Sequence, residues 1–146
     1  QLVNERESII NRKDGLLLNI KELDSTVLEV EKTQKEILAL NTKLNSLQIE
    51  LEKEKNSSQE LNAEASSLNY QANAQTTSFS SSDAATTAKD AKQTAQLLKK
   101  TETANKKLAK SQAKIADLQK QIDKVQRKLD KLNQKINFVD KPTTDN

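Results

Sequence analysis

Apolar residues recur at alternating steps of three and four over residues 115–139, and the series has no gap: Ile115, Leu118, Ile122, Val125, Leu129, Leu132, Ile136 and Val139. This is a heptad pattern, with Ile115 at an a position and Leu118 at d. The intervening residues are mostly Lys, Gln, Asp and Asn, so the predicted helix has one apolar stripe on an otherwise polar surface. Such a helix requires a partner stripe, and this requirement constrains the fold more than any other feature.

The first part of the chain carries a second heptad series over residues 2–51. Its d positions are Leu2, Ile9, Leu16, Leu23, Val30, Ile37, Leu44 and Leu51. Its a positions hold Ile20 and Val27, and otherwise the polar residues Lys13, Gln34, Asn41 and Gln48. A further apolar set on an adjacent stripe widens the face from about Ile37 onward; its members are Leu40, Leu47, Leu61, Ala65, Leu68 and Ala72. The pattern predicts a helix over about residues 2–75.

Residues 76–83 interrupt the two helices. They are Thr-Thr-Ser-Phe-Ser-Ser-Ser-Asp, short polar and β-branched residues that disfavour helix, and we predict a loop. Ser82 or Asp83 is the expected cap of a second helix over about residues 84–140. That helix should end there because Pro142 disfavours helix at Lys141, which leaves residues 141–146 as a polar tail.

Folding the chain back at the loop brings the two stripes together. With the fold at the loop centre, paired residues have numbers that add to about 159, and a positions face d positions. The predicted pairs are Ile20–Val139, Leu23–Ile136, Val27–Leu132, Val30–Leu129, Ile37–Ile122, Leu44–Ile115, Leu51–Leu108 and Leu61–Leu98. Near the loop, Ala65 and Ala72 are expected to face Ala88, Ala91 and Ala95. The predicted fold class is all-α: a long antiparallel two-helix coiled-coil hairpin with a Ser/Thr-rich tip loop, forming one module over residues 1–146. Its paired part would be roughly 85 Å long.

Charge and composition agree with this prediction. Residues 1–79 carry 9 basic and 13 acidic side chains, and residues 80–146 carry 15 basic and 8 acidic ones, so an acidic helix would lie along a basic one. The chain has one Gly, one Pro, no Trp and three other aromatic residues, which is too little bulk for a globular core.

The residues that common catalytic sites need are missing. The chain has neither Cys nor His, which excludes the usual zinc sites and any His-based triad, and a single Gly excludes a phosphate-binding loop. Carboxylates such as Glu50, Glu52 and Glu54 alternate with Lys53 and Lys55 on a solvated surface. We therefore expect no enzyme, no cofactor, no metal site and no small-molecule substrate. No run approaches the roughly 18 apolar residues of a membrane helix, and the start at Gln1 suggests an excised or processed piece.

Three features have alternative interpretations. The basic second helix could follow nucleic-acid phosphates, but Asp117, Asp123 and Asp130 interrupt it and no aromatic residue is placed to stack on bases. Polar residues within the stripes could line a buried ligand site or, as we favour, fix the pairing; they are Gln34, Asn41, Gln48, Thr101 and Ser111. Phe79 either folds over the tip of the helix pair or contacts a protein or a membrane.

Residues before Ile20 have no predicted partner, because Val139 is the last stripe residue of the second helix. They carry a wide apolar face formed by Leu2, Val3, Ile9, Ile10, Leu16, Leu17 and Leu18. Such a face rarely stays exposed on a monomer. We predict that residues 2–18 bind another copy of the chain or another segment of the parent protein, with Phe79 as a second contact; the alternative is a frayed end.

Residues 114–132 read KIADLQKQIDKVQRKLDKL. This stretch resembles coiled-coil ectodomains of bacterial type III secretion translocators and of streptococcal surface proteins. The likeness covers about 20 residues and consists of heptads with Lys, Asp and Gln between them, so it assigns no family and no residue role. It implies a secreted or cell-surface bacterial setting for a non-catalytic spacer or docking arm. A parallel self-associating stalk or fibre segment and a nucleic-acid-binding arm are the alternatives.

Overall fold

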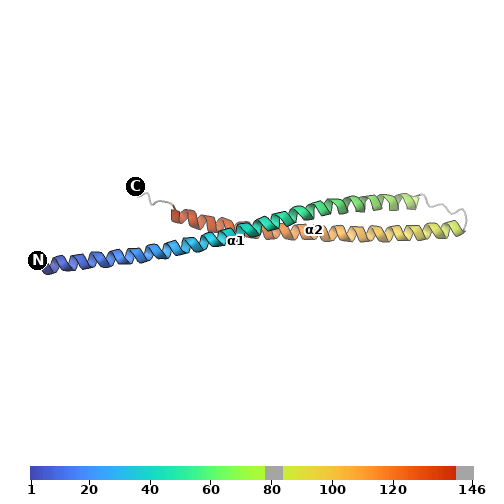
Figure 1. Cartoon of the computed structure of the whole chain (residues 1–146). Coiled ribbons are helices and arrows are strands. Elements are labelled where there is room, and N and C mark those ends of the chain that lie inside the picture. The colour runs from blue at the N-terminus through green and yellow to red at the C-terminus, as the bar shows by residue number, and fades with distance from the viewer. Residues whose placement is uncertain (78–83, 141–146) are drawn as a thin grey trace. The chain divides into compact units, whose positions relative to one another are not determined.

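The computed structural model describes residues 1–77 and 84–140, without the side chains of residues 138–140. It contains two helices, α1 (Leu2–Thr77) and α2 (Ala84–Asp140), which pack against each other as a hairpin (Figure 1). The predicted all-α two-helix hairpin is confirmed. The bounds of α2 are as predicted, whereas α1 continues to Thr77 instead of ending at 75. Phe79, the caps Ser82 and Asp83, and residues 141–146 lie outside the described residues.

Thr76 and Thr77 belong to α1 although Thr disfavours helix. The Thr76 hydroxyl donates a hydrogen bond to the Ala72 carbonyl at 2.7 Å, and the Thr77 hydroxyl donates to the Asn73 carbonyl at 3.0 Å. Both hydroxyls thus find an acceptor within α1, so the two residues can keep the helical backbone conformation. The loop that was predicted to begin at residue 76 therefore loses its first two residues to α1.

The chain divides into two compact units. The first contains residues 1–43 and 125–146, and the second contains residues 44–124. In each unit a segment of α1 lies beside an antiparallel segment of α2, and each unit has its own cross-helix contacts. Lys135 Nζ lies 3.2 Å from Glu29 Oε1 in the first unit, and the Ser111 hydroxyl donates to Glu54 Oε1 at 2.6 Å in the second.

Burial on both helices follows the alternating step of three and four. On α1 the buried and half-buried residues are Val30, Thr33, Ile37, Leu40, Leu44, Leu47, Leu51, Glu54, Ser58, Leu61, Ala65, Leu68, Ala72 and Gln75. On α2 the same series is Thr87, Asp90, Thr94, Leu97, Thr101, Ala104, Leu108, Ser111, Ile115, Leu118, Ile122, Val125, Leu129, Leu132 and Ile136, and Gln121 beside Ile122 is half-buried outside this series. The core is therefore one side chain wide, and it includes the stretch that dominates the sequence.

The stripe on α1 differs from the predicted one in half of its positions. The predicted d series from Val30 to Leu51 is half-buried, but its companions are Thr33, Leu40 and Leu47. Gln34, Asn41 and Gln48, which were placed inside the stripe, are exposed. The set that was interpreted as a widening of the face is thus the second half of the core. The reason is that a series with a step of seven identifies only one of the two rows that form the buried face. The second row can lie on either side of the first, and the step of seven does not specify which.

The pairing of the two helices is also shifted relative to the prediction. Residue numbers add to 164 for Glu29 and Lys135, to 165 for Glu54 and Ser111, and to 169 for Leu68 and Thr101, instead of about 159. The shift is about one heptad. It arises because the prediction assumed that α1 and α2 end level at the tip, whereas α2 begins beyond the level at which α1 ends (Figure 1).

Several predicted contacts near the tip are also wrong, because the α2 residues chosen for them lie outside the two heptad rows that continue from Ile115 and Leu118. Leu98, which was expected opposite Leu61, is 52% exposed, while its neighbour Leu97 is half-buried. Ala65 and Ala72 are buried as expected. Their expected partners are not: Ala88, Ala91 and Ala95 are all exposed, and the buried residues of α2 in this unit include Thr101 and Ala104.

Candidate interaction site

The N-terminal part of α1 is exposed, and it meets the described part of α2 near its end, where Glu29 contacts Lys135. Every residue from 1 to 29 is exposed, and Val30 is the first half-buried one. The seven apolar residues predicted as an interaction site all lie here, with 47–83% of their surface accessible: Leu2, Val3, Ile9, Ile10, Leu16, Leu17 and Leu18. We call residues 2–29 the N-terminal segment of α1. The eighth predicted contact, Phe79, lies outside the described residues.

The N-terminal segment is longer than the sequence suggested. Ile20, Leu23 and Val27 were expected to pair with α2, but they are 53%, 63% and 47% exposed. Ile136 was the expected partner of Leu23, yet it lines a small hollow with Thr26, Glu29, Val30, Thr33 and Lys135. The shifted pairing moves the end of α2 toward Val30, so residues 20–29 of α1 also stay exposed, although Thr26 and Glu29 adjoin Lys135 at the end of α2. The side chain of Val139, the expected partner of Ile20, is not described.

The apolar stripe also changes direction at Val30. From Leu16 to Val30 the apolar series runs Leu16, Ile20, Leu23, Val27 and Val30, whereas the buried series from Val30 onward runs Val30, Thr33, Ile37 and Leu40. Two consecutive steps of three therefore meet at Val30, a discontinuity of the heptad pattern. With Ile10 and Leu17 on the far side, the apolar face of the N-terminal segment is turned by roughly a quarter of a helical turn from the face that binds α2.

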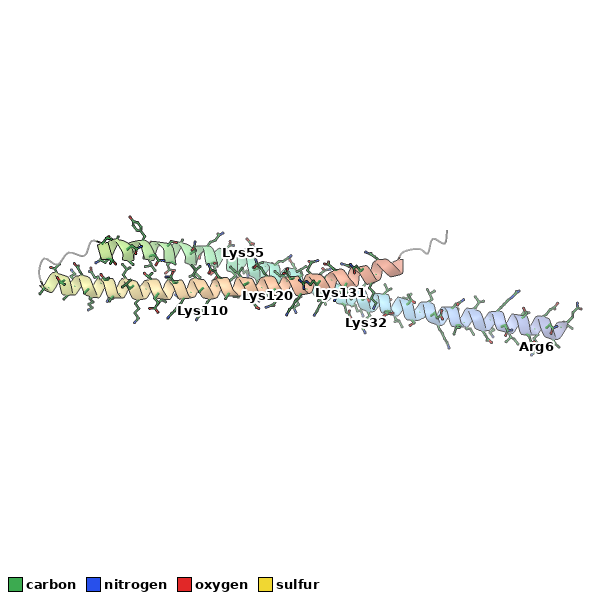
Figure 2. All side chains as sticks on the ribbon, turned by 180° about the vertical axis from the view of Figure 1, so that it is seen from behind. Arg6, Lys32, Lys55, Lys110, Lys120 and Lys131 are labelled. Carbon is green, nitrogen blue, oxygen red and sulfur yellow. The ribbon has the colours of Figure 1, made fainter. Side chains whose placement is uncertain are left out.

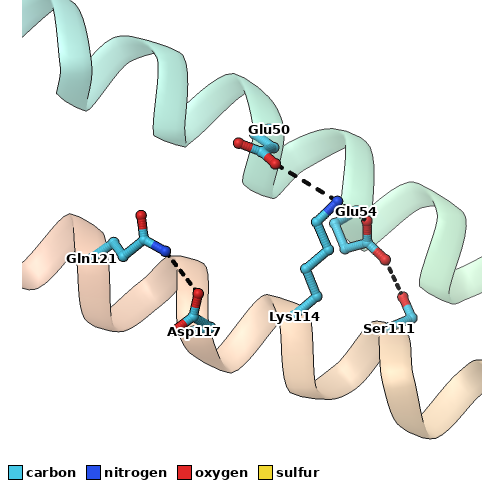
Figure 3. A network of polar contacts seen from close by, with 6 residues as sticks. All are labelled: Glu50, Glu54, Ser111, Lys114, Asp117 and Gln121. Carbon is cyan, nitrogen blue, oxygen red and sulfur yellow. Dashed lines mark hydrogen bonds and ion pairs between the residues drawn. The ribbon is translucent and has the colours of Figure 1, made fainter.

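A second feature is the polar network at the centre of the unit that contains residues 44–124 (Figure 3). Glu54 of α1 points toward α2, where its two carboxylate oxygens meet different groups. The Ser111 hydroxyl donates to Oε1 at 2.6 Å, and Lys114 Nζ lies 3.2 Å from Oε2. Lys114 Nζ is also 3.6 Å from Glu50 Oε1. On α2 itself, Gln121 Nε2 donates to Asp117 Oδ2 at 2.7 Å.

The network perturbs two ionisations. The hydrogen bond from Ser111, followed by the one from Lys114, lowers the pKa of Glu54 from its ordinary value of 4.5. The hydrogen bond to Glu54 and its negative charge raise the pKa of Lys114 from 10.5. Both shifts favour the charged forms, so the pair remains ionised at neutral pH. This behaviour is that of a structural ion pair and not that of a general acid or base, which needs a pKa close to the working pH.

Each buried hydroxyl in the core has a partner. Thr33 donates to the Glu29 carbonyl at 2.8 Å, and Thr101 donates to the Leu97 carbonyl at 2.8 Å, with the Leu68 carbonyl across the interface at 3.4 Å. Of the five polar residues placed in the stripes by sequence, only Thr101 and Ser111 are buried. Thr33 and Glu54 were missed because the prediction placed the second row of α1 on the side of Gln34 and Asn41, and Thr33 and Glu54 belong to the row that is buried instead.

Surface hollows along the helix pair are shallow and lined by side-chain stems. One of about 470 Å³ lies between Glu36, Ala39, Leu40, Lys128, Lys131 and Leu132. Another, of about 860 Å³, is formed by Glu64, Leu68, Gln96, Lys99, Lys100, Thr103, Ala104 and Lys107. Neither brings a carboxylate close to a nucleophile in an enclosed space. Within residues 1–77 and 84–140, no group of three His, Cys, Asp or Glu side chains is placed to hold a metal ion.

The basic side chains of α2 are spread along its length (Figure 2). Lys114 and Lys135 each contact an acidic side chain of α1, so the expected pairing of an acidic helix with a basic one is confirmed at these positions. Lys106 pairs with Glu102 on α2 itself. Lys99, Lys100 and Lys107 line one hollow together with Glu64, whereas Lys110, Lys120 and Lys131 are exposed along the helix.

Neither α1 nor α2, over their described lengths, has the stretch of apolar residues that crossing a membrane requires. Comparison of the chain with protein-family models, with curated proteins and with solved structures finds no match.

Proposed function

We propose that the chain is a non-catalytic coiled-coil arm that holds a protein-docking segment at a fixed distance from the rest of its parent protein. The observation that carries this proposal is the contrast along α1. From Val30 onward it is covered by α2 at every third and fourth residue, and before Val30 every residue is exposed although the apolar content is higher. A coiled coil is supported by the alternating burial step and by a core only one side chain wide.

The paired part suits a spacer because its contacts are distributed evenly. A helix rises 1.5 Å per residue, so distance along the arm is set by residue count alone. Small buried residues such as Ala65, Ala72 and Ala104 let the helices lie close, and cross-helix ion pairs occur in both units. The likeness of residues 114–132 to bacterial secretion and surface coiled coils supports a setting of that kind.

Spin-label distances test the arm. Lys89 and Lys120 are exposed residues of α2 in the same unit, and a continuous helix places them about 46 Å apart along its axis. We expect a narrow distance distribution near that value. Labels on Lys55 and Lys110, on different helices of this unit, should lie within about 20 Å of each other in single chains diluted among unlabelled ones.

A broad distribution between Lys89 and Lys120 would contradict the spacer, because a flexible arm cannot fix a distance. Labels on Lys55 and Lys110 that stay far apart in diluted chains would contradict intrachain pairing and favour the parallel stalk. The chain has no Cys, so each label pair can be introduced by replacing its two residues with Cys, and no native thiol has to be removed.

A further inference from the structure

Two hollows adjoin on one side of the helix pair in the unit that contains residues 44–124. The larger, of about 860 Å³, reaches from Gln96 to Lys107 on α2, and the smaller, of about 340 Å³, reaches from Lys107 to Lys114. Lys107 lines both, so together they extend along α2 for about 27 Å. The α1 residues that line them lie between Glu54 and Leu68. We call the two hollows together the lysine groove.

The lining of the lysine groove is basic, with five lysines and two acids. The lysines are Lys99, Lys100, Lys107, Lys110 and Lys114. Lys114 is already paired, because its Nζ lies 3.6 Å from Glu50 Oε1 and 3.2 Å from Glu54 Oε2 (Figure 3). The other four form no ion pair within residues 1–77 and 84–140. Between Lys99 and Lys110 the lining contains one acid, Glu64, so the unpaired positive charge is concentrated there.

Charged residues that flank the groove do not cancel this excess. Residues 54–68 of α1 contain two further charged residues, Lys55 and Glu60, which are of opposite sign. Residues 96–114 of α2 contain Glu102 and Lys106, which pair with each other at 3.0 Å. With all four included, the two segments keep the excess of three positive charges that the lining residues carry.

The lysines lack partners because the acids of α1 do not continue in step with them. Lys114 meets two acids of α1. One heptad nearer the tip, Lys107 takes the place of Lys114, and the corresponding α1 residues are Ser57 and Leu61. Neither of these carries a charge. Lys107 is therefore left without a cross-helix acid at the point where the two hollows meet.

The floor of the groove is apolar. Leu61 and Leu68 are half-buried, and Ala104 is 3% exposed. A ligand that offers only negative charge, such as a nucleic-acid backbone, would leave this apolar surface in water. A helix that carries acidic residues beside an apolar stripe matches both the lysines and the floor.

We propose that the lysine groove binds an acidic amphipathic helix of a partner protein. The apolar stripe of the partner lies on Leu61, Leu68 and Ala104, and its carboxylates lie beside the unpaired lysines. Lys100 and Lys107 are one heptad apart, so acidic residues that recur every seven positions meet both. About 18 residues of partner helix match the length of the groove. The site uses no residue of the N-terminal segment, so it adds a second docking surface to the proposed arm.

Fluorescence anisotropy with a labelled synthetic peptide and the full chain tests the proposal. The peptide has three heptads, with Leu at a, Ala at d, Glu at e and g, and Gln elsewhere. We expect a Kd on the order of ten micromolar, since the interface is small, and weaker binding as salt is raised. Two matched peptides separate the contributions of charge and apolar contact: one has Gln in place of every Glu, and the other has Gln in place of every Leu. Each should bind on the order of tenfold more weakly or worse.

A charge reversal in the chain locates the site. Lys107→Glu should weaken binding of the acidic peptide on the order of tenfold, because it removes the lysine that both hollows share. Lys107 is exposed and unpaired among the described residues, so the helicity of the variant should equal that of the wild-type chain. Lys120→Glu is the matched control. Lys120 is an exposed lysine of α2 in the same unit that does not line the groove, and its reversal should change binding less than about twofold.

Several outcomes overturn the proposal. They are the absence of binding up to about 100 micromolar chain, equal losses for Lys107→Glu and Lys120→Glu, and equal binding of the peptide that lacks Leu. Tighter binding of a random-sequence DNA duplex than of the acidic peptide, lost in Lys107→Glu, would assign the groove to nucleic acid instead. A dimer of the chain alone that Lys107→Glu abolishes in sedimentation equilibrium would assign it to a second copy. None of these measurements depends on the spacing role of the arm, which the Lys89–Lys120 distance tests separately.

Discussion

Leu129 provides the most direct test of where the core of the hairpin lies. Only 2% of its surface is exposed, and it belongs to the stretch of heptads that dominates the sequence. Leu129→Ala removes three carbon groups, worth about 0.8 kcal/mol each in transfer free energy, and leaves a cavity. Measured losses for this substitution in cores are about 2–5 kcal/mol. A core one side chain wide can close partly and admit water, so we expect the lower part of this range, about 2–3 kcal/mol.

Urea unfolding followed by far-ultraviolet circular dichroism measures this loss, and the melting temperature should fall by roughly 4–12 °C. Leu38→Ala is the control, because it makes the same chemical change in the same unit at a residue that is 69% exposed. Its effect should stay within about 0.5 kcal/mol. A loss below about 0.5 kcal/mol for Leu129→Ala, or equal losses for the two variants, would refute the assignment of the core.

Three further measurements address the pairing, the polar network and the N-terminal segment. Because Ser111 lowers the pKa of Glu54, this contact stabilises the hairpin fully above the ordinary pKa of 4.5 and is lost as the pH falls through the lowered value. The wild-type chain should therefore lose more stability than Glu54→Gln as the pH falls from neutral through this range; equal losses would contradict the shift. Leu97→Ala should destabilise the chain by more than about 1 kcal/mol and Leu98→Ala by less than about 0.5, whereas the reverse order would restore the pairing expected from sequence. Gly15→Ala adds a Cβ with nothing within 4 Å and gains about 1 kcal/mol of helix propensity, so hydrogen exchange near residue 15 should slow roughly fivefold. Unchanged exchange would show that the helix there is not limited by glycine.

The fold class was predictable because several features of the sequence indicate it independently. The series from Ile115 to Ile136 fixes one helix and its stripe, and all of its members are buried or half-buried in the structure. The Ser/Thr-rich stretch between the two apolar series predicts that the chain turns back there. Opposite charge on the two halves then favours antiparallel pairing. These signals are local or cumulative, so no single contact had to be known.

The pairing was not predictable from the same pattern. If one helix slides along the other by seven residues, the same apolar rows still face each other. Apolar periodicity therefore leaves several pairings of α1 with α2 that bury similar apolar surface. The prediction selected among them by assuming level helix ends. It also placed the second row of α1 on the side of Gln34 and Asn41, whereas Thr33 and Leu40 form it. That choice depends on which side of the stripe meets α2, which a single helix does not specify.

The length of the N-terminal segment follows from the pairing and was underestimated with it. The sequence identified Ile9, Ile10, Leu16 and Leu17 as an uncovered face, and the structure leaves them exposed. It did not identify the change of direction at Val30. The two consecutive steps of three are visible in the sequence, but they become informative only once the buried rows of α1 are known.

One polar contact distinguishes the observed pairing from pairings that differ by one heptad. A slide of seven residues would move Glu54 from Ser111 to Ala104 or Leu118, neither of which has a side-chain donor. The same slide would replace Lys114 by Lys107 or Gln121, so Glu54 would keep one side-chain donor and lose the one from Ser111. Loss of this hydrogen bond is unfavourable for a half-buried carboxylate, so Glu54 and Ser111 select one pairing among several that bury similar apolar surface. Replacing both residues by Leu should retain the hairpin and remove this selection. Spin labels on the exposed residues Lys55 and Lys92, which are offset along the pair, should then report a second distance that differs by roughly 10 Å, one heptad of helix rise. A single narrow distance in the double variant, unchanged from the wild-type chain, would show that the apolar contacts alone determine the pairing and that the Glu54–Ser111 hydrogen bond is a consequence of it.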